Sequence, residues 1–370
     1  MFSRAGNQRY KQSDRSRESG IALIIVMLVI VTLGIMAGGF AFSMRVETRL
    51  AGNSGMDSEF EWVGRSGMEL AKYALSLQQE PFDALGQFWA SGIWDPLGQE
   101  IPEISLTDNE LGRGVFSVKI VDLERKFNIN IADEIILNQS LTLIGVEPGD
   151  VDVVRDSILD WIDPDDETHL SGYESSDYLS MVPPYYGRYP YFAKNGPLDD
   201  ITELLKVYGV TPAMFWGNRI HEKRSAYVGS MANEGDEFLE EPPYLIGLAD
   251  LFSTISHSQM NLNTAPLEAL LLNPYVDENM ARDIISFRAG PDGVVGTEDD
   301  TPFQSVAEVS SIVGGNPQAA NMMSLYFTTA SVNFEVFVQV RIGQATRVFK
   351  GILRRNTPVD IQLIHFSWDQ

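Results

Sequence analysis

Cysteine is absent from all 370 residues, which excludes disulfide bonds and thiolate metal sites. The absence does not identify a compartment, because many exported bacterial proteins also lack cysteine. Histidine is scarce, and no two of the four histidines have the spacing of a zinc-binding pair. The sequence also contains no nucleophile elbow and no phosphate-binding glycine loop. It therefore gives little support to an enzyme.

Basic residues are also few. Lysine and arginine number 27 against 51 aspartates and glutamates, so the formal net charge is -24. The first twenty residues carry five basic and two acidic side chains, so the remainder of the chain stands at -27. Such a surface repels phosphate backbones and anionic lipid headgroups.

One long apolar run is present near the N-terminus. Between Gly20 and Arg45 lie 24 residues without a charge, and as a helix they would extend about 36 Å, enough to cross a hydrocarbon core. Basic residues dominate the segment before the run, so the positive-inside rule places the first twenty residues in the cytoplasm. Everything after about residue 45 is then outside the cell's inner membrane. A plain signal anchor would give the same pattern.

The start of the run favours a more specific interpretation. A basic leader that ends in glycine and is followed by an uncharged helix resembles the prepilin class of export signal. In that family a membrane peptidase cuts after the glycine, and the match falls on Gly20 and Ile21. Most members carry glutamate at the fifth mature position, where this chain has Ile25. The resemblance implies that this subunit has no carboxylate with which to pair with a subunit ahead of it. Such a subunit suits the tip of an assembly.

The helix is predicted to continue beyond the bilayer to about residue 78. Apolar or small residues recur at alternating steps of four and three, which places them on one helical face. We expect this stripe to pack both on neighbouring subunits and on the chain's own globular part, with a weak joint at residues 51–55. The stripe consists of Met56, Phe60, Val63, Gly67, Leu70, Ala74 and Leu77.

The remaining sequence predicts an α+β fold. Residues 79–111 have no clear period and indicate loops, and residues 114–130 contain the first firm strand. Two alternating strands are predicted within residues 333–355, and residues 361–368 favour a further one. Strands at both ends of a helical middle indicate an antiparallel sheet interrupted by an insertion.

The helical middle contains a diverged internal repeat. An Asn-x-Asn entry followed by a helix occurs at residues 127–146 and again at residues 260–276. Later in each copy, a proline and an N-capping residue precede Glu203 or Glu308, and Gly209 or Gly314 closes the unit. Such units resemble helix-hairpin-helix modules. Their acidic surroundings oppose nucleic-acid binding, so scaffolding or a protein-binding face is the favoured use.

Seven carboxylates fall within residues 160–177 and would repel one another if the fold held them together. Calcium is the natural counter-ion, because it takes six to eight oxygens in irregular geometry, although the spacing is not that of an EF-hand. A solvated acidic loop is the alternative. A second candidate site lies in the glycine-rich loop at residues 290–303, where a plain surface turn explains the pattern equally well. Its acidic residues are Asp292, Glu298, Asp299 and Asp300.

Several segments together resemble the minor pseudopilin K family of the bacterial type II secretion system. They are the Gly20/Ile21 junction, "FNIN", "DWIDPDDETHLSGYE", "PLDDITELLKVYG" and "NLNTAPLEALL". The resemblance implies a leader (1–20), an N-terminal helix (21–78), a pilin-like sheet domain in two parts (79–128 and 326–370) and an inserted α-helical domain (129–325).

The same resemblance implies two bound calcium ions and a place at the tip of a periplasmic pseudopilus, beside minor pseudopilins I and J. Carried over to this chain, the calcium ligands are Asp163, Asp165, Glu174 and Asp177. Asp160 is a further candidate that could instead cap or brace its helix. Family members usually have alanine where this chain has Tyr173, which crowds the turn. The loop at residues 290–303 is also longer than expected.

The implied partners are other pseudopilins, a prepilin peptidase and the inner membrane, with no nucleic acid. Two alternatives stay open at this point. One is a membrane-anchored periplasmic enzyme or receptor, which predicts an uncleaved leader and a ligand pocket. The other is a helix-hairpin-helix DNA-binding protein, which predicts salt-sensitive DNA binding.

Overall fold

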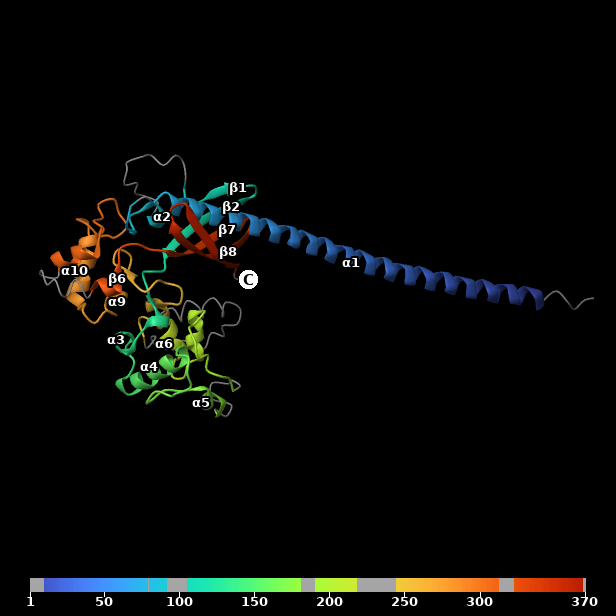
Figure 1. Ribbon diagram of the computed structural model, residues 1–370. Helices are drawn as coiled ribbons and strands as arrows, with labels where there is room; N and C mark the ends of the chain where they lie inside the picture. The colour runs from blue at the N-terminus through green and yellow to red at the C-terminus, as the bar shows by residue number, and fades with distance from the viewer. Residues whose placement is uncertain are drawn as a thin grey trace, which may run out of the picture. The chain divides into compact units, whose positions relative to one another are not determined.

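The computed structural model describes residues 10–78, 80–91, 105–180, 190–217, 244–312 and 323–368. The chain divides into two compact units, residues 1–62 and 63–370. Figure 1 shows the elements. The helices are α1 (Tyr10–Ser76), α2 (Phe88–Ser91), η1 (Ile129–Ile131), α3 (Glu134–Ile144), α4 (Pro148–Ile162), α5 (Ser175–Ser180), η2 (Ile201–Lys206), α6 (Pro212–Trp216), α8 (Leu248–Leu251), α9 (Leu267–Leu270), α10 (Glu278–Arg288), η3 (Val306–Glu308) and α11 (Val309–Ile312). The strands are β1 (Asn109–Leu111), β2 (Gly114–Asp122), β3 (Phe127–Asn128), β4 (Phe252–Ser253), β5 (Met260–Asn261), β6 (Phe327–Thr328), β7 (Asn333–Ile342), β8 (Ala345–Thr357) and β9 (Asp360–Trp368).

Helix α1 is 67 residues long and continues through residues 51–55, where a weak joint was expected. Its apolar part, Leu23–Thr48, has a mean hydropathy of 2.7, and none of it is buried. By length and composition this part could cross a membrane, because a span needs about 20 apolar residues. The prediction of a single long apolar helix at the N-terminus is therefore confirmed.

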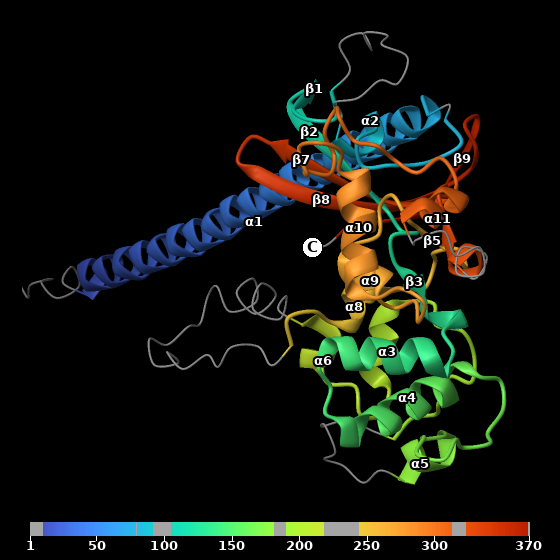
Figure 2. The same ribbon diagram turned by 90° about the vertical axis from the view of Figure 1, so that its left-hand side faces the viewer.

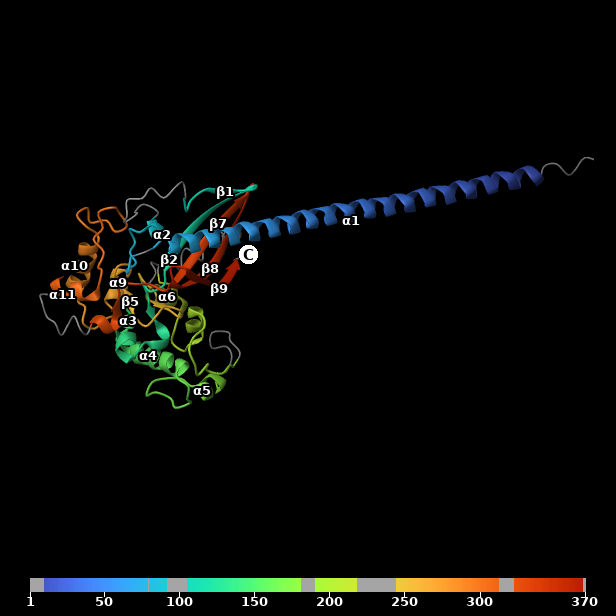
Figure 3. The same ribbon diagram turned by 45° about the horizontal axis from the view of Figure 1, so that its top comes forward.

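The last turns of α1 lie against the five-stranded sheet, as Figure 3 shows. Small residues permit this close approach. A Cβ atom on Gly64 would lie 2.7 Å from the ring of Phe349, and one on Gly67 would lie 2.3 Å from Val338 Cγ1. Val63 and Ala74 from the predicted stripe are buried here. The stripe thus packs on the chain's own sheet over this part of the helix.

The sheet is antiparallel throughout, in the order β1-β2-β7-β8-β9. Strand β2 alternates as predicted, with Phe116, Val118, Ile120 and Asp122 buried on one face. It pairs with β7 from Gly114 opposite Ile342 to Asp122 opposite Phe334. Strands β7, β8 and β9 confirm the C-terminal strands. Residues 79–111, expected to be loops, also contain α2 and β1, two elements too short to show a period.

The regular structure between β2 and β7 is mainly helical, and this region contains both predicted repeats. Figure 2 shows α3, α4 and α5 grouped together, with α9, α10 and α11 nearer to the sheet. Two parallel two-residue ladders, β3 with β4 and β5 with β6, lie at the entries of the two copies. Side chains from both copies share one apolar core, including Leu137 and Ile158 from the first and Leu270 and Ile284 from the second.

The two Asn-x-Asn entries make the same hydrogen bonds. The Asn130 side chain accepts from the backbone N–H of Leu198 at 2.6 Å and donates to its carbonyl oxygen at 3.1 Å. In the second copy, Asn263 accepts from the N–H of Phe303 at 2.8 Å and donates to its carbonyl at 2.9 Å. Each asparagine therefore ties the start of its copy to the segment before the later short helix. Gly314 lies outside the described residues.

Candidate functional site: the acidic loop after α4

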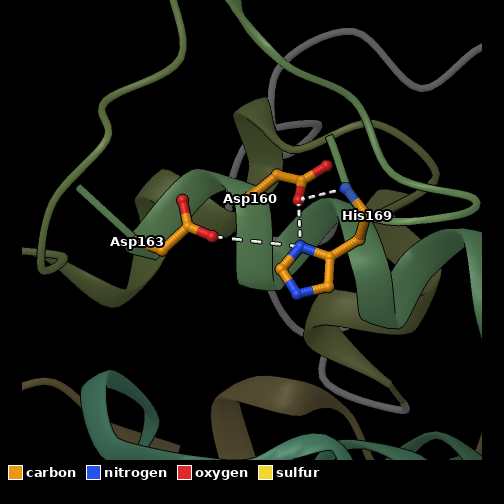
Figure 4. A group of neighbouring side chains, drawn as sticks. All are labelled: Asp160, Asp163 and His169. Atoms are coloured by element: carbon orange, nitrogen blue, oxygen red, sulfur yellow. Dashed lines mark hydrogen bonds and ion pairs between the residues drawn. The ribbon is translucent and has the colours of Figure 1, made fainter. Parts of the chain in front are cut away.

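The acidic loop begins where α4 ends. Asp160 lies in the last turn of α4, Asp163 caps its C-terminus, and His169 lies in the loop that follows. One oxygen of Asp160 accepts a hydrogen bond from the backbone N–H of His169 at 3.0 Å and also contacts Nδ1 of its ring. The same Nδ1 lies 3.9 Å from Asp163 Oδ2. Figure 4 shows both carboxylates directed toward the imidazole.

Glu174 is the second buried carboxylate of the loop, after Asp160. Their side chains come from different elements, because Glu174 immediately precedes α5. Glu174 Oε2 accepts from the backbone N–H of Ser175 at 3.1 Å, and the Glu174 N–H donates to Asp177 Oδ2 at 3.0 Å. These two bonds fix the start of α5 and the direction of the glutamate.

Electrostatic shifts show that the carboxylates interact. Burial, together with the nearby charges of Asp160 and Asp163, raises the pKa of Glu174 to about 7. Burial and the charges of Asp165 and Asp160 also raise the pKa of Asp163. In contrast, the hydrogen bond to Asp160 raises the pKa of His169, because the carboxylate stabilises the protonated ring. The loop thus holds negative charge that favours a cation.

Three buried carboxylate oxygens in the loop have no hydrogen-bond partner. They are Asp160 Oδ2, Asp163 Oδ1 and Glu174 Oε1. Buried acceptors without a donor are costly, and a hard cation that binds oxygen would satisfy them. Among the described residues, only Asp160, Asp163 and His169 form a group of possible metal-binding side chains with ligand atoms within 4.8 Å of one another. The oxygens fit calcium, whereas the imidazole places a proton-dependent positive charge beside them.

The predicted ligands do not all have the same surroundings. Asp165 is exposed, and its Oδ1 accepts from the backbone N–H of Glu167 at 2.9 Å. Asp177 Oδ2 accepts a hydrogen bond from the backbone N–H of Glu174. His169 was not among the predicted ligands, because a single histidine that folds back onto α4 does not have the sequence spacing of a two-histidine metal site. The full ligand set stays a prediction.

The second candidate loop, between α10 and η3, uses most of its carboxylates to hold its own backbone. Asp299 accepts from the N–H of Asp292 at 2.9 Å and from the Thr297 hydroxyl at 2.7 Å, and these bonds lower its pKa. Asp300 accepts from the N–H of Gly296 at 2.8 Å, and burial raises its pKa. Its other oxygen is buried without a partner, and Glu298 is exposed. A second ion here stays a prediction.

Known proteins resemble this chain over most of its length. Residues 124–216 match the family model of "Type II secretion system (T2SS), protein K". A type II secretion system protein K from Pseudomonas aeruginosa is 22% identical over 368 residues, covering 95% of this chain and 92% of the relative. The chain is therefore similar to type II secretion system protein K sequences over most of its length. Its relationship to these protein K sequences is distant.

Two other protein K relatives match a shorter part. The protein from Klebsiella pneumoniae is 24% identical over 233 residues, and that from Pectobacterium carotovorum is 23% identical over 222 residues. The matches span 64% and 61% of those relatives' lengths and 59% and 54% of this chain. The fold resembles a chain in the crystal structure of the GspK-GspI-GspJ complex from enterotoxigenic Escherichia coli. The TM-score is 0.58 at 17% identity, covering 86% of this chain and 99% of that one.

Proposed function

We propose that the chain is a minor pseudopilin that caps the tip of the type II secretion pseudopilus and takes part in its assembly. The observation that carries the proposal is the end-to-end correspondence with a protein K sequence, together with the fold of a chain solved in complex with GspI and GspJ. Its role is structural rather than enzymatic. The partners are then the pseudopilins I and J of the same system.

The long apolar helix supports a prepilin-type route to the inner membrane. Residues 1–20 are the leader, cut between Gly20 and Ile21 by a prepilin peptidase, and the globular part lies in the periplasm. Because Ile25 stands where most pilin-like subunits have glutamate, the mature chain offers no carboxylate to a subunit above it. The bulky inserted region would also obstruct further addition. Both features suit a terminal position.

Leader cleavage is the first test. The full chain is co-expressed with a prepilin peptidase, and the mass of its N-terminal peptide is measured. We expect a start at Ile21, and we expect Gly20→Trp to keep the Met1 start. A wild-type chain that keeps Met1, while a control prepilin in the same cells is cut, would contradict the proposal.

Assembly with partners tests the tip position. The mature chain is co-expressed with pseudopilins I and J, and complexes are purified by a tag on I. We expect all three proteins to elute together at equal stoichiometry, and Ile25→Glu to leave this complex intact. Absence of a three-protein complex under conditions where I and J associate would contradict the assignment.

Calcium is proposed to hold the acidic loop in one shape, with Asp160, Asp163 and Glu174 as its oxygen donors and Asp165 and Asp177 as further candidates. Such an ion would neutralise the repulsion between the carboxylates and fix the C-terminus of α4 relative to α5. The three unpartnered buried oxygens support this role.

The calcium proposal is tested by thermal unfolding with calcium and with chelator. Asp163→Asn and Glu174→Gln should each lower the unfolding temperature in calcium and change it little in chelator, because binding stabilises only the folded state. Asp199→Asn is a matched control, since its exposed carboxylate pairs with Lys194 outside the loop. Equal losses in both conditions would show that these side chains do not bind the ion.

A further inference from the structure

A second group of buried carboxylates lies at the junction of the sheet and the inserted region. It consists of Asp83, which follows α1, Asp122, the last residue of β2, and Glu124 two residues later. Their side chains are 1%, 1% and 0% exposed. This junction group is separate from the acidic loop, and its members are far apart in the sequence. Only the fold brings them together.

Asp122 connects three segments of the chain. Its Oδ2 accepts hydrogen bonds from the hydroxyl of Thr264, from the hydroxyl of Ser331 at 2.7 Å and from the side-chain amide of Asn261 at 3.3 Å. Asn261 and Thr264 belong to the entry of the second repeat, and Ser331 lies just before β7. One carboxylate therefore ties the end of β2 to both the inserted region and the return strand.

Glu124 makes a parallel set of contacts. Its carboxylate accepts from the backbone N–H of Asn333 at 3.0 Å, from the Asn333 side chain at 2.8 Å and from the N–H of His257 at 3.1 Å. Its own carbonyl oxygen accepts from the N–H of Asn261 at 2.8 Å. Glu124 thus also bridges the first residue of β7 and the inserted region.

Among the described residues, the guanidinium of Arg355 pairs with a carboxylate of this group. Arg355 from β8 donates to Asp83 Oδ2 at 2.5 Å and to the Ser331 carbonyl at 2.9 Å, and its guanidinium lies over the Phe334 ring. His257 contributes a backbone N–H, while its ring contacts Ser258. The titratable groups at the junction are therefore Asp83, Asp122, Glu124, His257 and Arg355.

Ionising all three carboxylates here would leave uncompensated buried charge. Burial, followed by the charge of Glu124, raises the pKa of Asp122 to about 7. Burial likewise raises the pKa of Asp83 and that of Glu124, although Arg355 opposes the shift at Asp83. When two nearby carboxyl groups are buried together, the first proton is held by the pair.

We propose that Asp122 and Glu124 share one proton and that this proton controls how firmly the inserted region is joined to the sheet. We call the junction closed when the inserted region is packed on the sheet as in this structure, and open when water enters between them. In the closed joint the proton neutralises one buried negative charge. In an opened joint water solvates both carboxylates, and each titrates near its ordinary value. Acid therefore favours the closed joint, and raising the pH favours opening. This device does not depend on the place of the chain in a pseudopilus.

The sign and range of the effect follow from proton linkage. Between the ordinary pKa of an aspartate, about 4, and the raised value in the closed joint, the closed state binds more protons than the open one. The opening equilibrium should therefore increase by up to about tenfold per pH unit in that range. At pH values above that raised pKa the closed state loses the proton as well, so the increase should level off.

Hydrogen exchange on the full chain in detergent micelles measures this opening directly. Amide exchange is followed at residues 255–264 and 329–333 between pH 5 and pH 8.5, and each rate is divided by the intrinsic rate at that pH. We expect the corrected rate to rise from pH 5, to rise less steeply near pH 7 and to approach a constant value by pH 8.5. A flat corrected rate in the wild type would by itself overturn the proposal.

Variants separate the shared proton from other titrations. Asp122→Asn removes one titrating group while keeping the shape, so the rise should be strongly reduced; Glu124→Gln is the second variant if the first does not fold. Glu335→Gln is the control, because Glu335 lies on β7 of the same sheet but pairs with Lys350 on its outer side. The control should keep the wild-type profile. A rise that persists unchanged in Asp122→Asn would assign the titration to another group.

An infrared titration gives an independent readout. A protonated buried carboxyl has a C=O stretch distinct from that of a carboxylate. We expect this band at pH 6, its loss by pH 8.5 and its reduction in Asp122→Asn but not in Glu335→Gln. A band that is equally strong in Asp122→Asn would contradict the assignment.

Discussion

Gly172 allows the Asp160 carboxylate to lie against the returning loop. A Cβ atom at position 172 would lie 1.9 Å from Asp160 Oδ2, well inside van der Waals contact. The neighbouring Tyr173 was expected to crowd this turn, and its ring is found stacked on Tyr208 with centroids 3.7 Å apart. The turn therefore needs glycine at position 172 for close approach rather than for an unusual backbone angle.

Gly172→Ala should displace Asp160 and disrupt the acidic loop. We expect a loss of about 1–3 kcal/mol in unfolding free energy and a smaller calcium-dependent rise in unfolding temperature. Gly149→Ala, near the start of α4, is the matched control, since a Cβ there meets nothing within 4 Å. It should be neutral or slightly stabilising. A Gly172→Ala protein with normal stability and calcium response would show that the loop adapts.

The equivalent asparagines of the two repeats, Asn130 and Asn263, are expected to contribute unequally to the free energy of unfolding. Asn263→Ala leaves the buried N–H and carbonyl of Phe303 without partners, so a loss of about 2–4 kcal/mol is expected. Asn130→Ala should cost less, because Asn130 is only half-buried. Urea unfolding measures both, with the exposed Asn356→Ala as a control expected to change little. Equal losses for Asn130 and Asn263 would contradict the burial argument.

At the scale of elements, the sequence predicted those strands and helical units whose residues follow a regular pattern. The strands within residues 114–130, 333–355 and 361–368 alternate clearly, and the two repeats share capping residues, so both were found from the sequence. Strand β1 has three residues and therefore shows no alternation. The sequence also indicated which region is acidic. It could not show that His169 folds back onto Asp160, or that Asp83 meets Asp122, because both depend on tertiary packing.

The contact between α1 and the sheet depends on glycine at the crossing point. Gly67→Ala should destabilise the chain by about 1–3 kcal/mol, because its Cβ would overlap Val338. Combining it with Val338→Ala should cost less than the sum of the two single changes, as expected for residues in contact.

Chemical unfolding in detergent measures this coupling. Gly38→Ala on the same helix is the control, because a Cβ at Gly38 meets nothing within 4 Å. Additive losses in the Gly67 and Val338 pair would contradict direct packing.

For the whole molecule, the apolar part of α1 contributes nothing to a buried core. None of Leu23–Thr48 is buried, whereas residues from Val63 onward pack on the sheet. A chain that begins at Val46 should dissolve without detergent and unfold within about 2 °C of the full chain. Differential scanning calorimetry of both forms makes the comparison. A large drop in unfolding temperature would show that the removed segment supports the globular unit.

The pairing of β2 with β7 has a consequence for the rate of folding. Glu124 and Asn333, which hydrogen-bond at this junction, are 209 residues apart in the sequence. Closing so long a loop costs little more free energy than closing a loop half that length, but sheets built from distant pairings form slowly. The inserted region, whose repeats rely on more local contacts, is thus expected to fold first and to bring the strands together. Refolding should then show two phases, with the core around Trp161 becoming protected before Trp89 packs against Phe334 on the sheet.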